Sequence, residues 1–197
     1  MTKDVIPLYD KIAGWFDASR SRTLMERRYL DFLVSRVPAG ASVLDLGCGA
    51  GEPIMRFLLE ENFHVLGVDA SAAMLAFAKS RFPTARFLQA DMRHLDLNEK
   101  FDAIIAWHSF FHLPHDDQRR MFPVLGAHTA PGGLLMFTSG PRHGEDWGEN
   151  GGEQLYHASL DAEEYRALLG ANGFAVLEHV VEDPDCGGAT VWVARHA

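Results

Sequence analysis

The amino-acid sequence predicts an α/β fold in which helices cover both faces of a mostly parallel sheet. Short apolar runs alternate with stretches of helical periodicity along most of the 197 residues. An apolar run over residues 42–46 leads into three glycines at alternate positions, Gly47, Gly49 and Gly51, and a helical pattern follows them. Near the C-terminus two strand patterns follow each other without a helix between them, which indicates an antiparallel pair at the edge of the sheet.

The first part of the chain is predicted to be helical. Apolar residues at helical spacing indicate a helix over about 5–16, and a second helical pattern runs over about 24–37 and ends at a Pro-Ala-Gly segment. We expect residues 1–38 to form a helical cap on a single domain that spans residues 1–197.

The next elements alternate regularly. The pattern predicts strands at 42–46, 64–68, 85–89, 101–107 and 134–138. Helices are expected from 54 to about 62, after Ser71, which is suited to cap a helix, and from Asp116 or Asp117 onward. Pro123 predicts a kink or an early break in the last of these helices.

Residues 139–158 differ from the rest of the chain. Five glycines interrupt a polar segment that we expect to be a long loop resembling a lid, since a loop of this length in a compact domain is usually a lid or a binding loop. A capping box from Asp161 to Glu164 then begins a helix that ends at Gly170 or Gly173. Two final strands are expected at about 174–182 and 189–194.

The glycine-rich turn is suited to a cofactor that lies against bare backbone. The dinucleotide fingerprint needs its third glycine at position 52, where this chain has Glu52, whose carboxylate would repel a pyrophosphate. No Gly-Lys-Ser/Thr run of a P-loop occurs. The turn therefore favours a nucleotide-like ligand without phosphate groups.

Two further carboxylates follow predicted strands. Asp69 ends the run at 64–68, and Asp91 follows the strand at 85–89. Asp69 could alone be a helix cap and Asp91 alone a turn residue. Because the carboxyl ends of parallel strands meet at one edge of the sheet, their joint occurrence after successive strands indicates a shared ligand site.

The order Asp45-x-Gly47-x-Gly49-x-Gly51, then Asp69, then Asp91, resembles the signature of class I S-adenosylmethionine-dependent methyltransferases over about residues 40–140. The resemblance implies a Rossmann-like, doubly wound sheet of seven strands, with the last strand antiparallel. It also implies S-adenosylmethionine as the cofactor and S-adenosylhomocysteine as its product.

The resemblance also assigns roles to residues. The turn beside Asp45 would lie against the methionine portion, Asp69 would accept hydrogen bonds from both ribose hydroxyls, and Asp91 with Met92 would contact the adenine. We place three further residues in the cofactor site: Tyr9, Met74 and Trp107.

Composition narrows the possible partners. The formal net charge of −9 argues against non-specific nucleic-acid binding, and a local arginine cluster is most simply a solvated helix face: Arg20, Arg22, Arg27 and Arg28. The chain has two cysteines, Cys48 and Cys186, which indicate neither a disulfide framework nor a zinc site. Without a secretory signal or an apolar run of membrane-spanning length, we expect a cytoplasmic monomer or homodimer with no membrane partner.

Three histidines follow the strand at 101–107, where the resemblance places the methionine end of the cofactor: His108, His112 and His115. His112 matches a position that is commonly histidine in family members acting on small molecules. Packing or exposure is the ordinary explanation for any one of them. Pro114 and the lack of a nearby cysteine disfavour a metal site, so we expect none and assign His108 to acceptor binding.

Aromatic residues in the glycine-rich segment and in the first helix could close a pocket for a small acceptor. We assign Trp147 and Tyr156 from the segment, and Trp15 from the helix, to this pocket, although Trp15 could instead cover an apolar surface. Because the segment is acidic, a neutral or cationic acceptor is favoured over an anionic one.

The implied reaction is direct displacement of the sulfonium methyl group by an oxygen, nitrogen or carbon atom of a small molecule. His112 and His157 are the candidates if a base is needed, because imidazole titrates near neutral pH. Two alternatives stay open: a non-catalytic S-adenosylmethionine-binding module, which a fold cannot exclude, and a NAD-dependent oxidoreductase, against which Glu52 and Asp91 argue.

Overall fold

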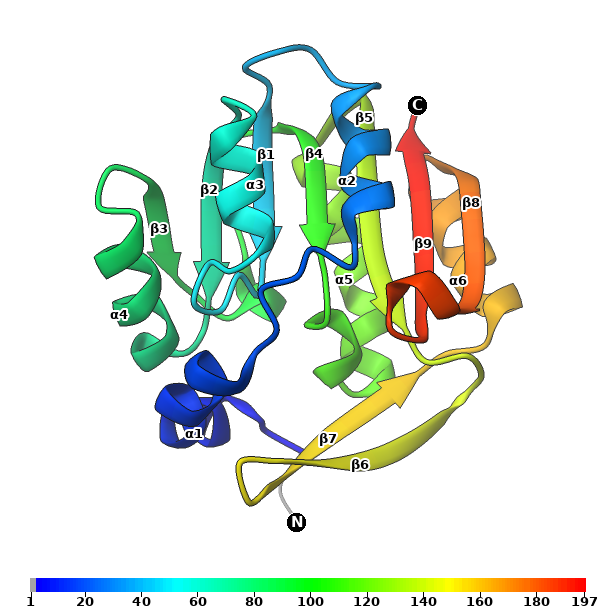
Figure 1. The fold of residues 1–197 in the computed structure, drawn as a ribbon. Helices are drawn as coiled ribbons and strands as arrows, with labels where there is room; N and C mark the ends of the chain where they lie inside the picture. Colours follow the sequence, from blue (N-terminus) through cyan, green and yellow to red (C-terminus); the bar gives the residue numbers. More distant parts are fainter. Residues whose placement is uncertain (1–2) are drawn as a thin grey trace.

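The computed structural model describes residues 3–197, so the first two residues of the predicted 1–38 cap lie outside the description. At its centre is a seven-stranded sheet in the order β3-β2-β1-β4-β5-β9-β8 (Figure 1). The pairs β3–β2, β2–β1, β1–β4 and β4–β5 are parallel, whereas β9 runs antiparallel to β5 and to β8. The predicted doubly wound sheet with an antiparallel last strand is confirmed. The strands are β1 (Ser42–Leu46), β2 (His64–Asp69), β3 (Arg86–Gln89), β4 (Phe101–Ala106), β5 (Thr129–Ser139), β8 (Phe174–Asp183) and β9 (Ala189–His196).

Helices cover both faces of the sheet because side chains alternate along its buried strands. In β1, Val43 packs in the hydrophobic layer under α2 and α3, and Leu44 packs in the layer under α5 and α6. Figure 1 shows α2 and α3 in front of the sheet and α5 and α6 behind it. No helix within residues 3–197 is long and apolar enough to cross a membrane. The helices are α1 (Ile6–Ser19), α2 (Arg27–Val34), α3 (Ile54–Glu60), α4 (Ala72–Arg81), α5 (His115–His128) and α6 (Ala162–Ala171), with short 3₁₀ helices η1 (Met92–His94), η2 (Phe110–His112) and η3 (Pro184–Cys186).

Two predicted helix starts are confirmed by their capping contacts. The Ser71 hydroxyl accepts the Met74 N–H at 3.1 Å before α4. The Asp161 carboxylate accepts the Glu164 N–H at 2.8 Å before α6. The early break expected at Pro123 is wrong, because α5 continues through this residue to His128. Burial of its apolar face against the sheet outweighs the hydrogen bond that proline removes.

The loop predicted over 139–158 is a β-hairpin. β6 (Gly144–Asn150) pairs antiparallel with β7 (Glu153–Ser159) through seven residue pairs. Gly151 and Gly152 form the two-residue turn with φ of +58° and +80°, as a type I′ turn requires. The signal was present as Asn-Gly-Gly at 150–152, but the apparent excess of glycine indicated a loop. Gly148 is needed inside the strand, because a Cβ there would lie 2.7 Å from the His157 ring.

The hairpin and α1 lie below the sheet in Figure 1, at the end where β1, β2 and β4 terminate. The first turn at this end follows β1 and is closely packed. Gly47 has a φ of +76°, and a Cβ added to it would lie 2.2 Å from the Cβ of Ser109. Ser109 is held in turn by its hydroxyl, which donates to the Leu46 carbonyl at 2.6 Å. Gly49 also has a positive φ, of +54°, but the space around it is open.

We expect Gly47→Ala to lower the free energy of unfolding by about 3 kcal/mol, because it combines a left-handed backbone with a clash against a buried neighbour. Gly49→Ala is the matched control. It should lower the free energy of unfolding by only about 1 kcal/mol, since it places alanine in a left-handed backbone but causes no clash. Chemical denaturation of the two variants measures both values. Equal losses would show that the contact with Ser109 does not limit this turn.

Candidate active site

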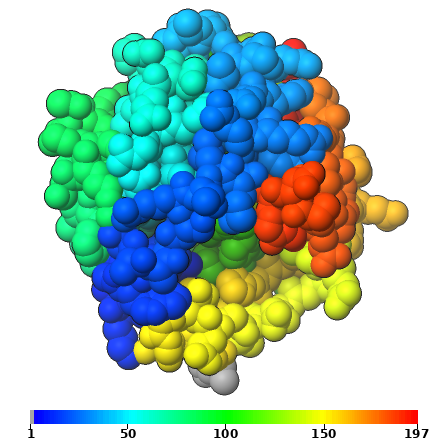
Figure 2. Space-filling model, viewed as in Figure 1, coloured from blue at the N-terminus to red at the C-terminus, as the bar shows by residue number. Residues whose placement is uncertain are grey.

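A cavity of about 1120 Å³, including the part open to solvent, lies at the carboxyl ends of β1, β2 and β4. In Figure 2 the green centre of the chain is visible in a hollow between the dark blue N-terminal segment and the yellow hairpin. The structure brings every residue predicted for the cofactor site to the wall of this cavity: Tyr9, Asp45, Gly47, Gly49, Gly51, Asp69, Met74, Asp91, Met92 and Trp107.

Asp69 connects the tip of β2 to the glycine turn. One of its oxygens, Oδ2, accepts the Gly49 N–H at 2.8 Å, and the other accepts the Ser71 N–H at 2.8 Å. Burial raises the pKa of Asp69, although these hydrogen bonds oppose the rise. The carboxylate therefore shapes the turn and also lines the cavity.

The N–H groups of the turn are largely consumed by the protein itself. Gly47 and Cys48 donate to the Val68 carbonyl at 2.7 and 3.1 Å, and Gly51 donates to the Cys48 carbonyl at 2.9 Å. Together with the donation from Gly49 to the β2 carboxylate, four N–H groups of the turn already have acceptors. They are not free to bind a phosphate in the way that a dinucleotide-binding or P-loop turn does.

Asp45 is a buried carboxyl group on the cavity wall. It is 4% exposed, and within residues 3–197 no hydrogen-bond donor contacts its side chain. Burial, followed by the charge of Asp69, raises the pKa of Asp45 to about 7. Arg20 opposes this rise and also lines the cavity, where its Nε donates to the Glu52 carbonyl at 3.3 Å.

Arg20 is a site residue that the sequence did not identify. It follows the C-terminal end of α1 and belongs to the arginine cluster interpreted as a solvated surface. Only the packing of α1 against α4 and the glycine turn brings it to the cavity. No local pattern in the sequence distinguishes it from Arg22.

Asp91 reaches the cavity with a cationic partner. The Nε of Arg93 lies 2.9 Å from both of its oxygens, and Arg93 also donates to Asp117 at 3.4 Å. Partial burial alone would raise the pKa of Asp91, but the hydrogen bonds and charge of Arg93 lower it below its ordinary value. Met92 lies next to this pair on the cavity wall.

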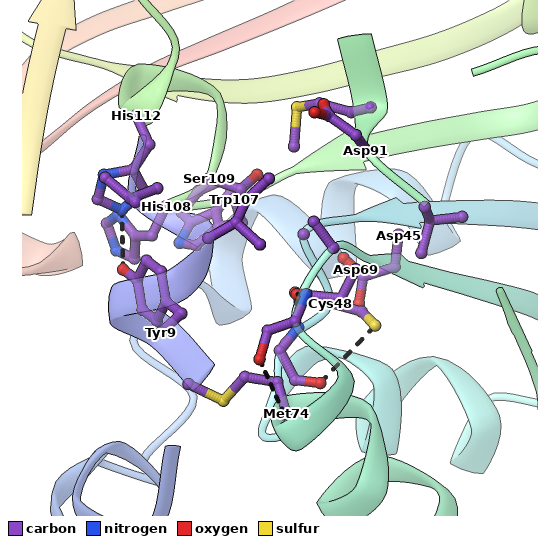
Figure 3. A pocket seen from close by; sticks show the side chains of 18 of the residues that line it. Tyr9, Asp45, Cys48, Asp69, Met74, Asp91, Trp107, His108, Ser109 and His112 are labelled. Carbon is purple, nitrogen blue, oxygen red and sulfur yellow. Dashed lines mark hydrogen bonds between the residues drawn. The ribbon is translucent and has the colours of Figure 1, made fainter. Parts of the chain in front are cut away.

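His112 joins three distant parts of the chain. Its Nε2 lies 2.8 Å from the Tyr9 hydroxyl (Figure 3). Its Nδ1 lies 2.8 Å from the Tyr156 carbonyl oxygen. Because a carbonyl only accepts, Nδ1 carries the proton, Nε2 accepts, and Tyr9 donates. Burial lowers the pKa of His112 to about 3, so that the ring is neutral. With both nitrogens engaged, His112 has no free lone pair to act as the expected base.

The second candidate base, His157, contacts His112 but does not line the cavity. The two rings lie 4.8 Å apart between centroids. Burial lowers the pKa of His157, and Asp146 opposes this effect. Its position follows from the hairpin register, which sets it opposite Asp146.

Three residues assigned to acceptor binding lie outside the cavity wall. Trp15 is 48% exposed and covers Gly151 in the hairpin turn. The Trp147 and Tyr156 rings pack against each other at 5.3 Å, and the Tyr156 side chain is fully buried. Since the segment is a paired hairpin, its aromatic rings pack within the protein. His108 does line the cavity.

Two acidic residues of the hairpin pair with lysines of the N-terminal segment. Glu145 lies 2.6 Å from Lys3, and Glu153 forms an ion pair with Lys11. Neither carboxylate lines the cavity, so the acidity of this segment does not set the charge of the acceptor site. Within residues 3–197 no group of three or more His, Cys, Asp or Glu side chains is placed to hold a metal ion.

Sequence comparison gives two matches. Residues 43–133 match a family model described as a methyltransferase domain. Trans-aconitate 2-methyltransferases of Escherichia coli and Shigella flexneri are 36% identical over 125 residues, which are 61% of this chain and 46% of the relatives. The chain thus spans about half the length of the curated relatives it matches.

Solved structures share the fold over nearly the whole chain. An amino pentose methyltransferase of Micromonospora echinaspora, involved in calicheamicin biosynthesis, superposes with a TM-score of 0.73 at 23% identity and covers 94% of this chain and 95% of its own. The 1,6-didemethyltoxoflavin-N1-methyltransferase of Burkholderia thailandensis superposes with a TM-score of 0.73 at 22% identity, covering 98% of this chain and 88% of its own. The chain is thus similar in sequence to methyltransferases over residues 43–133, and it shares its fold with these solved methyltransferase structures.

Proposed function

We propose that the protein binds S-adenosylmethionine in this cavity and transfers its methyl group to a small-molecule acceptor. One observation carries the proposal. Three carboxylates, Asp45, Asp69 and Asp91, line the wall beside a glycine turn whose N–H groups are already used. Such a wall favours a nucleoside that carries positive charge and no phosphate.

The residues present fit the parts of this cofactor. A carboxylate offers about four acceptor positions, of which Asp69 uses two for backbone N–H groups, so others remain for the ribose hydroxyls. Asp91 and Met92 lie where the adenine is expected. Asp45 would pair with the α-ammonium group and Arg20 with the carboxylate of the methionine portion, since these two charges face the same part of the cavity. When bound, the cofactor supplies an electrophilic sulfonium methyl group.

A small acceptor is supported by what covers the cavity. Ion pairs of Lys3 and Lys11 join the N-terminal segment to the hairpin, and His112 connects Tyr9 of α1 to the Tyr156 carbonyl of the hairpin. This cover leaves no broad open face for a folded macromolecule. The relatives and neighbours are named for trans-aconitate, an amino pentose and 1,6-didemethyltoxoflavin. We place the reaction in the cytoplasm and involve no nucleic acid.

This chain's own contribution to the chemistry is positioning. Methyl transfer needs the acceptor atom in line with the sulfur–methyl bond, and alignment supplies much of the rate. The Tyr9 hydroxyl donates its proton to His112, which leaves the lone pairs of the phenolic oxygen to accept a hydrogen bond at the cavity. Burial also raises the pKa of Tyr9, so the phenol stays neutral.

Calorimetry tests the cofactor assignment. We expect S-adenosylmethionine and S-adenosylhomocysteine to bind in the micromolar range, and NAD and ATP about 100-fold more weakly, because the turn has few free N–H groups for phosphate. Equal or tighter NAD binding contradicts the proposal and favours the oxidoreductase. Cofactor binding without formation of S-adenosylhomocysteine on any small acceptor would favour a non-catalytic module.

Asp69→Ala should weaken binding of S-adenosylhomocysteine by about 2–3 kcal/mol, since it removes charge-assisted hydrogen bonds to the ribose. It should also lower the stability of the free protein by about 1–2 kcal/mol, because Gly49 and Ser71 lose their acceptor. Asp96→Ala, at an exposed position, is the control for both measurements. If stability falls and the affinity of the folded protein is unchanged, Asp69 has only a structural role.

Asp45→Asn should alter how stability depends on pH. With its pKa at about 7 in the folded chain, the wild-type protein binds one more proton than the unfolded chain between about pH 4 and 7, so its stability falls as pH rises through that range. Asp45→Asn lacks this pH dependence. Its free energy of unfolding should therefore rise relative to that of the wild type by on the order of 3 kcal/mol between pH 4 and pH 8. Denaturation curves of the cofactor-free proteins at both pH values measure the difference. A constant difference across the range would contradict the buried, protonated Asp45.

A further inference from the structure

His108 occupies an unusual position at the end of β4. Its φ is +50°, a left-handed conformation that is uncommon for a residue other than glycine. The backbone is held there by its N–H, which donates to the Thr138 hydroxyl at 2.9 Å. Such conformations are enriched at ligand sites because they place a side chain where an extended strand cannot.

The ring of His108 has free polar atoms on the cavity. Within residues 3–197 neither ring nitrogen has a hydrogen-bond partner, and its neighbours are aromatic: Trp107 at 5.9 Å and Phe111 at 5.9 Å between centroids. His112, by contrast, has both nitrogens engaged. Figure 3 shows His108 beside the Tyr9–His112 pair, on the side of the cavity away from Asp69.

With the cofactor bound as proposed, the surroundings of His108 carry no cation that is free to bind an anion. Burial, with the nearby Arg20, lowers the pKa of His108 to about 4, so the ring is neutral at neutral pH. Lys3 pairs with Glu145, and Arg93 pairs with Asp91 and Asp117. Arg20 donates to the Glu52 carbonyl, and under the proposed function its guanidinium pairs with the carboxylate of the cofactor.

We propose that His108 binds the methyl acceptor, and that the acceptor is an uncharged molecule whose N–H or O–H donates to the free ring nitrogen of His108. The inference rests on the proposed function and assigns the acceptor side of the same cavity. The hydrogen bond directs a lone pair of the acceptor's nitrogen or oxygen toward the cofactor. A carboxylate acceptor would instead be desolvated between neutral aromatic rings without a cationic partner. In this respect the chain departs from its relatives named for trans-aconitate, which is an anion.

The test uses the full chain saturated with S-adenosylhomocysteine and probes that differ only in charge. The pairs are 4-hydroxybenzamide with 4-hydroxybenzoate, and anthranilamide with anthranilate, and trans-aconitate is a further anion. Calorimetry should show each amide binding at least about tenfold more tightly than its carboxylate. Tighter binding of the carboxylates or of trans-aconitate, or no binding of either amide, overturns the assignment.

Two substitutions isolate His108. His108→Phe keeps the ring volume and loses both polar atoms, so it should weaken amide binding by at least about tenfold. His108→Asn keeps a donor and an acceptor and tolerates the left-handed backbone, so it should restore part of that binding. His64→Phe, exposed at the start of β2, is the matched control and should change nothing. Equal amide affinity in wild type and His108→Phe overturns the role of His108.

A spectroscopic readout separates contact from an indirect effect. In protein labelled with ¹⁵N-histidine, the His108 signals are identified by their loss in His108→Phe. We expect them to shift when 4-hydroxybenzamide is added to the S-adenosylhomocysteine complex, while the His112 signals stay near their free positions because that ring is already engaged. A shift of the His112 signals with unchanged His108 signals would show that His112 binds the acceptor and would overturn the role of His108. Failure of the wild-type protein to bind S-adenosylhomocysteine would instead contradict the proposed function.

Discussion

The site depends on the hydrogen bond from the Gly49 N–H to the Asp69 carboxylate. This contact joins the turn after β1 to the tip of β2, and the other oxygen of the same carboxylate holds the Ser71 N–H at the start of α4. One side chain therefore sets the shape of the glycine turn, the entry to a helix and an acceptor surface on the cavity. The contact also removes one N–H group from those that could bind phosphate, so ligand selection and loop structure have the same physical origin.

Burial of carboxylates on the cavity wall lowers the stability of the protein without its ligand. Burial raises the pKa of both Asp45 and Asp69, and the charge of Asp69 raises the pKa of Asp45 further. Among the cavity carboxylates, Asp91 differs because Arg93 neutralises it. A cationic ligand beside Asp45 would relieve part of this unfavourable burial. Buried charge that lacks a protein partner is common where binding requires it, and rare elsewhere.

The cover of the cavity is built from segments far apart in the chain. Tyr9 from α1, His112 from η2 and the Tyr156 carbonyl from β7 form one chain of hydrogen bonds. Ion pairs of Lys3 and Lys11 with the hairpin flank it at exposed positions, where such pairs contribute little to stability. The buried hydrogen bonds therefore define how α1 and the hairpin meet, and they use His112 as a neutral connector.

The sequence by itself determined the sheet, the glycine-turn side of the cavity and most helix starts. These features depend on local patterns: strand and helix periodicity, the glycine turn, and acidic residues directly after strands, all of which the fold carries to one edge. Ser71 and Asp161 cap helices because their side chains satisfy nearby N–H groups, which is also a local property. The hairpin turn at Gly151 and Gly152 was local as well, and its signal was misinterpreted as that of a loop.

The tertiary structure decided the side of the cavity that His108 and His112 line. Which nitrogen of His112 carries a proton depends on a carbonyl 44 residues away, and its role as a connector depends on Tyr9, which is 103 residues away. Pro123 stays within α5 because the sheet buries that helix, and Arg20 reaches the cavity only through the packing of α1. Hydrogen-bond partners, burial and strain at these residues arise between segments that are distant in sequence, so no local pattern encodes them.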